Sequence, residues 1–128
     1  MNTVDIFVFG SNEQGIHGKG AALYAVKAWG AIKGIGFGLQ GRSYAIPTKS
    51  TPRHTLPLEK VSSYVKEFIA HAEAHPHNRF LLSKIGCGLA GFNEAQISPL
   101  FRESPANVFL INEAGEPVFP ASEWVERL

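Results

Sequence analysis

The chain has 128 residues, a length typical of one globular domain, and 45% of its residues are hydrophobic, which excludes a disordered chain. The 12 basic and 11 acidic side chains give a formal net charge of +1, and no basic block occurs, which argues against nucleic acid as a partner. The single cysteine, Cys87, cannot form an intramolecular disulfide, which is typical of a reducing compartment. Residues 1–5 show no leader pattern and no apolar run reaches the roughly 18 residues of a membrane helix, so we expect one cytoplasmic domain, residues 1–128, without a membrane partner.

The first third of the chain has the pattern of a strand, a glycine loop and a helix. Residues 4–9 form an apolar run that ends at Gly10, as in a strand buried on both faces of a parallel sheet. Residues 11–20 form a polar loop with three glycines, and residues 21–29 carry apolar side chains at helical spacing. Residues 30–41 contain five glycines and are therefore expected to form a loop.

The remainder of the chain continues the alternation of strands and helices. Residues 43–46 predict a strand that Pro47 should stop, because proline cannot donate to a ladder, and a loop should follow over 48–56. Apolar residues recur every three or four positions over 58–75, which predicts an amphipathic helix. The further predicted elements are a strand over 80–85, a glycine loop over 86–91, a short helix capped by Asn93 and split at Pro99, a strand over 107–111, a turn over 112–117 and a last helix over 122–128. This alternation predicts an α/β fold with a mostly parallel sheet, helices on both faces and a ligand at the carboxyl ends of the strands.

Two glycine loops could hold a phosphate group. Residues 86–91 have the spelling G-x-G-x-x-G, follow a strand and precede a helix, so their backbone amides could face a diphosphate. The alternative is a tight turn that needs glycine only for its backbone angles. Residues 36–41 have the same spelling but precede a strand, and the loop that ends at residues 18–20 has Ile16 where a Walker motif needs lysine. Loops that leave parallel strands open on the same edge of the sheet, so the loops over 11–20 and 86–91 predict one diphosphate ligand.

Three side chains in or beside these loops have both a structural and a functional interpretation. Cys87 has no nearby histidine to activate it, which favours packing over a nucleophilic role. His17 is either a ligand contact or a solvated loop histidine, and Asn12 either contacts the ligand or bonds to its own loop backbone. The three histidines near the end of the 58–75 helix lack further ligands, so neither a metal nor a cofactor is predicted.

Catalytic carboxylates are restricted by composition. Asp5 is the only aspartate and precedes a buried strand, so a catalytic carboxylate would have to be a glutamate. Glu13 and Glu94 lie beside the two glycine loops, with a solvated loop charge as the alternative for each.

Three segments resemble the macrodomain family, whose members bind ADP-ribose. The strand over 4–12, followed by a glycine loop and an alanine-rich helix, resembles the first strand and ligand loop of macrodomains. Residues 44–49, Tyr-Ala-Ile-Pro-Thr-Lys, resemble the strand of terminal ADP-ribose glycohydrolases that ends on the catalytic lysine, and residues 85–89, Ile-Gly-Cys-Gly-Leu, resemble their phosphate loop. The pattern is also similar to small bacterial and phage proteins. Over residues 4–111 the resemblance implies a three-layer α/β/α macrodomain-like fold.

The resemblance implies binding of ADP-ribose or a related nucleotide diphosphate, free or on an ADP-ribosylated macromolecule. In an enzyme Lys49 would attack the distal ribose, whereas the alternative is an ordinary lysine at the mouth of the cleft. Ala90 stands where that branch has the aspartate that completes hydrolysis, so proton transfer would pass to Glu13, Glu94 or His17. A hydrolase, a protein that only reads or sequesters ADP-ribose, and an enzyme acting on a free NAD-derived nucleotide all remain open. The residues expected to contact the ligand are Ser11, Asn12, Gly18, Lys19, Gly20, Gln40, Gly86, Cys87, Gly88, Leu89, Ala90 and Gly91.

Overall fold

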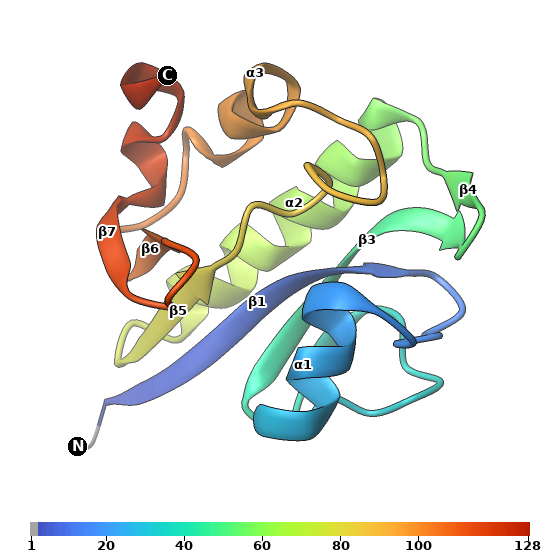
Figure 1. Cartoon of the computed structure of the whole chain (residues 1–128). Coiled ribbons are helices and arrows are strands. Elements are labelled where there is room, and N and C mark those ends of the chain that lie inside the picture. The colour runs from blue at the N-terminus through green and yellow to red at the C-terminus, as the bar shows by residue number, and fades with distance from the viewer. Residues whose placement is uncertain (1–2) are drawn as a thin grey trace.

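The computed structural model describes residues 3–128. Residues 1–2, which belong to the segment 1–5 that shows no leader pattern in the sequence, lie outside the described part. Its centre is one sheet of seven strands in the order β2-β3-β1-β5-β6-β7, with β4 paired to the end of β3 (Figure 1). The strands are β1 (Val4–Asn12), β2 (Gly38–Gln40), β3 (Ser43–Thr51), β4 (His54–Thr55), β5 (Asn78–Leu82), β6 (Val108–Ile111) and β7 (Pro117–Pro120). The helices are α1 (Gly20–Ala28), α2 (Leu58–Ala74) and α3 (Glu94–Ile97), with the 3-10 turns η1 (Ser98–Phe101), η2 (Ala121–Glu123) and η3 (Val125–Arg127).

The four central strands are parallel and the outer strands are antiparallel. β1 pairs in parallel with β3 and β5, and β5 pairs in parallel with β6. β2 and β4 pair antiparallel with β3, and β7 pairs antiparallel with β6. The carboxyl ends of β3, β1, β5 and β6 therefore meet at one edge of the sheet, from which the glycine loops leave.

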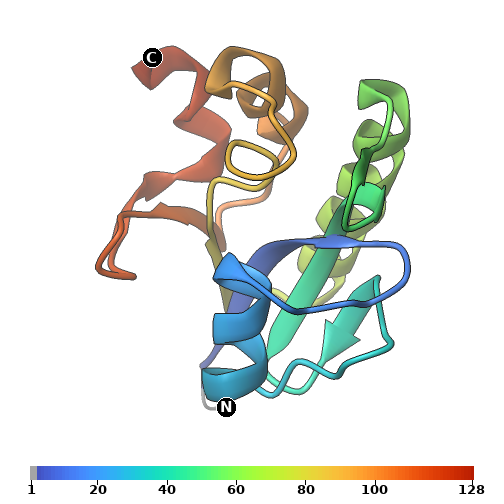
Figure 2. The same ribbon diagram turned by 45° about the vertical axis from the view of Figure 1, so that its right-hand side comes forward.

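Helices cover both faces of the sheet because side chains alternate along the buried strands. Figure 2 shows α1 and α2 on opposite faces of the sheet. Ile6 and Val8 of β1 join the core beneath α2, whereas Phe7 and Phe9 join the core beneath α1. The buried face of α2 consists of Val61, Val65, Phe68, Ile69 and Ala72. These layers confirm the predicted α/β/α architecture.

The sequence suggested that Pro47 ends the second predicted strand, but in the structure it does not. β3 continues through it to Thr51. On its outer side, β3 pairs with β2 only as far as Ala45 and with β4 from Lys49 onward. Pro47 lies in the gap between those partners, a position in a sheet that tolerates proline.

β1 also continues through Gly10 to Asn12, into the predicted loop over 11–20, because its end pairs with the extended β3. The remaining differences concern short elements. β2 lies inside the predicted loop over 30–41, β4 inside the loop over 48–56, and β7 follows the predicted turn over 112–117. The C-terminal helix is replaced by η2 and η3, and β5 is displaced two to three residues toward the N-terminus from the range predicted. By contrast α1, α2, β6 and the Asn93 cap of α3, with its reciprocal bond to Gln96, were predicted closely. Within residues 3–128 no helix is both long and apolar enough to cross a bilayer.

Candidate functional site

A cavity of about 570 Å³ lies at the carboxyl ends of β1, β3 and β5. Four segments form its walls: the end of β1 over residues 10–12, the glycine loop and start of α1 over 16–22, the end of β3 and its hairpin over 48–53, and the loop after β5 over 83–90. The two glycine loops predicted to share a ligand therefore line one cavity.

The structure brings most of the predicted contact residues to this cavity. Those that line it are Ser11, Asn12, Gly18, Lys19, Gly20, Lys49, Gly86, Gly88, Leu89 and Ala90. Those placed elsewhere are Glu13, His17, Gln40, Cys87, Gly91 and Glu94.

Asn12 closes the first glycine loop with its side chain. Its Nδ2 donates to the carbonyl of Ile16 at 2.8 Å, and its Oδ1 accepts from the amide of Ile16 at 3.0 Å. Asn12 therefore bonds to its own loop backbone, as one of its two interpretations had it, and it also lines the cavity where a ligand would lie.

His17 and Gln40 form a buried polar cluster behind that loop. His17 is 1% exposed, and its Nε2 lies 3.0 Å from the carbonyl of Ile35 and 3.3 Å from Oε1 of Gln40. Both partners are acceptors, which assigns the hydrogen to Nε2. Gln40 Oε1 also accepts from the amide of Ile32 at 2.8 Å, and the imidazole packs edge-on against Phe9. These bonds connect the first glycine loop to residues 30–41.

Residues 30–41 dock against the cavity wall through glycine backbone. A Cβ on Gly36 would lie 2.3 Å from the carbonyl oxygen of Asn12, and one on Gly15 would lie 2.4 Å from the carbonyl carbon of Gly34. The amide of Gly34 donates to the carbonyl of Gly15 at 2.8 Å, and Ser11 Oγ donates to the carbonyl of Gly36 at 2.5 Å. Only glycine permits backbones to approach so closely, which explains the glycine-rich composition of this segment.

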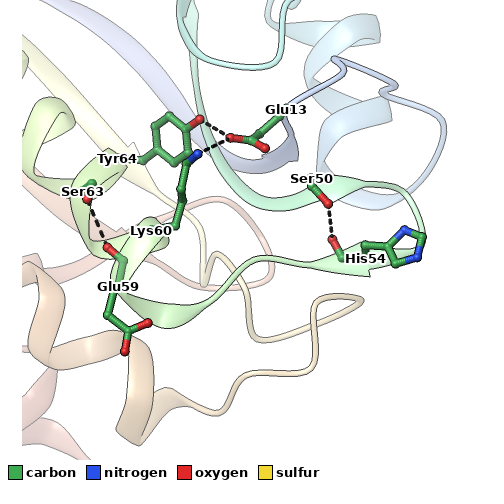
Figure 3. A network of polar contacts seen from close by, with 7 residues as sticks. All are labelled: Glu13, Ser50, His54, Glu59, Lys60, Ser63 and Tyr64. Atoms are coloured by element: carbon green, nitrogen blue, oxygen red, sulfur yellow. Dashed lines mark hydrogen bonds and ion pairs between the residues drawn. The ribbon is translucent and has the colours of Figure 1, made fainter.

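The carboxylate of Glu13 faces α2 and not the cavity. It accepts a hydrogen bond from the hydroxyl of Tyr64 and lies 3.4 Å from Nζ of Lys60, both on α2 (Figure 3). The bond from Tyr64, followed by the ammonium of Lys60, holds the pKa of Glu13 below its usual value. Burial, together with Glu13, raises the pKa of Tyr64 to about 12. At neutral pH the pair is therefore a carboxylate and a protonated phenol.

Glu94 has a similar set of partners on the other side of the cavity. It accepts from Nε1 of Trp124 at 2.7 Å and pairs with Nζ of Lys84 at 3.3 Å. The indole bond, followed by Lys84, lowers the pKa of Glu94. Lys84 itself lines the cavity, so Glu94 contacts a residue of the cavity wall without lining the cavity itself.

The second glycine loop needs glycine at both of its ends. Gly86 and Gly91 have φ angles of +74° and +84°, which favour glycine. Cys87 between them packs against the core beneath α2, and burial raises the pKa of its thiol. The packing interpretation of Cys87 therefore fits its surroundings. Thr55 Oγ1 donates to the carbonyl of Ala90 at 2.8 Å and connects the loop to β4.

Two solved structures share this architecture. One is a DarTG protein from Thermosipho africanus in complex with ADP-ribose, which matches 99% of this chain with a TM-score of 0.61 and 17% sequence identity. The other is a macrodomain protein from Streptomyces coelicolor, which matches over 86% of this chain and 88% of its own length with a TM-score of 0.59 and 15% identity. The chain has a macrodomain-like fold. It spans 42% of the length of the DarTG chain. No protein-family model and no curated protein sequence matches the chain.

In this macrodomain-like fold the charged side chains that line the cavity within residues 3–128 are all cationic, and one of them, Lys84, is paired with Glu94 outside the lining. Among residues 3–128, the charged side chains that line it are Lys19, Lys49, Arg53 and Lys84. Sequence reasoning singled out the first two and missed the others. Lys84 lies two residues before the second glycine loop, and that position was a usable signal. Arg53 had none beyond its nearness to Lys49. Such a cavity attracts a multiply charged anion.

Proposed function

We propose that this chain binds ADP-ribose, or a closely related nucleotide diphosphate, in the cavity between the two glycine loops. The observation that carries the proposal is the convergence of both loops and four cations on one cavity that no carboxylate lines within residues 3–128. Backbone amides and cations together stabilise a diphosphate. The structural neighbour from Thermosipho africanus, solved with ADP-ribose, supports the same ligand.

Isothermal titration calorimetry with ADP-ribose tests the proposal, and Gly88 offers a sharp variant. Gly88 lines the cavity, has no positive φ, and a Cβ there would meet no atom within 4 Å. Gly88→Glu should therefore fold normally and weaken binding at least about tenfold, because it places an anion beside the diphosphate. The matched control is Ala114→Glu in the exposed turn between β6 and β7, which should bind as the parent does. Absence of binding at millimolar ADP-ribose contradicts the proposal.

We further propose, on the resemblance to terminal ADP-ribose glycohydrolases, that Lys49 is the nucleophile if the ligand is hydrolysed from an acceptor. Lys49 is half-buried at the carboxyl end of β3, and its Nζ donates to the carbonyl of Pro52 at 3.2 Å. Attack by the neutral amine would form a bond between Nζ and the anomeric carbon and break the bond to the acceptor oxygen, with one proton passing from Nζ to that oxygen through water. A second water would then add its oxygen to the anomeric carbon and break the bond to Nζ, which releases ADP-ribose and returns one proton to the amine. Loss of turnover in Lys49→Ala with ADP-ribose affinity retained supports this role.

A binding protein that does not hydrolyse its ligand is the second candidate. Ala90 favours it, because this alanine lines the cavity at the position where the resembled branch has an aspartate. The cavity also has no lining carboxylate among the described residues. Turnover of an ADP-ribosylated protein by the parent chain, lost in Lys49→Ala, would exclude it. Products formed from a panel of free NAD-derived nucleotides would instead indicate an enzyme whose substrate is a free nucleotide.

A further inference from the structure

Glu13 connects the strand that carries Lys49 to helix α2. Glu13 directly follows β1, and its backbone amide donates to the carbonyl of Lys49 at 2.9 Å. Its side chain contacts Tyr64 and Lys60 on α2 (Figure 3). One residue thus bonds through its backbone to Lys49 and through its carboxylate to the longest helix of the fold.

Side-chain hydrogen bonds join residues of the hairpin beyond Lys49 to one another. Lys49 Nζ donates to the carbonyl of Pro52. Ser50 Oγ donates to the carbonyl of His54 at 3.3 Å (Figure 3). All of these bonds lie within the hairpin, whose tip is exposed. At the Lys49 end, β3 is joined to the end of β1 by the pairing of Lys49 with Asn12 and by the bond from the amide of Glu13. At the β4 end, the bond from Thr55 to the carbonyl of Ala90 joins the hairpin to the second glycine loop.

We propose that Glu13 is a positioning residue for Lys49: by bonding to Tyr64 it fixes the end of β1 and, through it, the place of the Lys49 amine at the cavity. The inference rests on the proposed role of Lys49. It gives Glu13 a function that differs from the proton transfer expected from its sequence position, because its carboxylate is turned away from the cavity. The Glu13 carboxylate and the Tyr64 hydroxyl keep their protonation states on both sides of neutral pH, because the pKa of Glu13 is lowered and that of Tyr64 is about 12.

The test measures how fast a water-soluble acyl ester modifies Lys49, read by mass spectrometry against the exposed Lys27 of α1 in the same molecule. We expect Glu13→Ala to raise the relative rate at Lys49 at least about threefold, because the lysine leaves its fixed place. Tyr64→Phe should do the same, and it remains informative if Glu13→Ala does not fold. Glu13→Gln, whose Oε1 can still accept from Tyr64, should stay near the parent rate. With an ADP-ribosylated peptide, kcat of Glu13→Ala should fall about tenfold while KM changes less than twofold.

The matched control is Asp5→Ala. Asp5 lies at the other end of β1 and is bonded twice to Arg79 of β5, at 2.9 Å each. Its loss should lower stability without changing the acylation of Lys49. An unchanged rate in Glu13→Ala, or an equal rise in Asp5→Ala, overturns the positioning role. Protection of Lys49 by ADP-ribose in the parent protein tests the proposed ligand separately, because the dependence on Glu13 is measured without ligand.

Discussion

Replacing Gly36 by alanine tests whether residues 30–41 support the cavity without lining it. The new Cβ would lie 2.3 Å from the carbonyl oxygen of Asn12 and 2.6 Å from that of Glu13, whereas ordinary contacts begin at 3.4 Å. These are backbone atoms that cannot rotate away, so the two segments must separate by about 1 Å. Overpacking of this kind costs about 1–3 kcal/mol, which corresponds to a fall in Tm of roughly 4–12 °C for a domain of this size.

Thermal unfolding and titration with ADP-ribose should be measured on the same samples. We expect Gly36→Ala to bind about three- to tenfold more weakly, because the displaced carbonyls belong to the end of β1 that forms one cavity wall. Gly115→Ala is the control: its φ of +83° makes alanine strained, but no atom lies within 4 Å and the turn is remote from the cavity. It should lose stability and keep its affinity. A Gly36→Ala protein with the parent Tm and affinity refutes the reasoning.

Three further changes probe the fold around the site. Gln40→Leu removes the acceptor of the Ile32 amide, whereas Nε2 of His17 keeps the carbonyl of Ile35 as its partner. Urea unfolding should show a loss of about 1–3 kcal/mol, against no loss if water replaces the side-chain amide. The pKa of His71 is lowered by burial and by neighbouring His75, so the stability of the folded state should be full above about pH 6.5 and fall below it. His71→Phe should flatten that fall between pH 7 and pH 5, and an unchanged pH profile would contradict the assignment. Trp124→Phe removes the indole bond to Glu94 and should cost about 1–3 kcal/mol by the same measurement, whereas a fully stable variant would show that the bond is dispensable.

The elements predicted well are those whose pattern is strong over several turns or buried on both faces. The apolar residues of α2 recur at helical spacing over 17 residues, and β1 is apolar on both faces because helices cover both sides of it. β2 and β4 have three and two residues, too few for alternation to be visible. They exist because β3 offers them an edge, which is information from the tertiary fold. The same neighbours explain why Pro47 continues a strand.

For the site, position along the chain predicted the walls better than the directions of side chains. Loops that follow parallel strands must open on one edge, and this rule alone predicted that Gly18 and Gly88 lie at one cavity. The direction of a carboxylate depends on partners that are distant in sequence. Glu13 turns to Tyr64, 51 residues away, and Glu94 turns to Trp124, 30 residues away. Neither partner carries a sequence signal that links it to a glycine loop.

The margins of the sheet also restrict how this protein can meet other chains. β7 begins and ends with proline, so Pro117 and Pro120 present no N–H to a neighbour. At the other margin β2 is three residues long and starts at Gly38, whose φ of +95° departs from an extended strand. An added β-strand needs a continuous row of free backbone donors and acceptors, and neither margin supplies one. Growth of the sheet by strand addition is thus disfavoured at both ends, and a partner protein has to recognise side-chain surfaces instead.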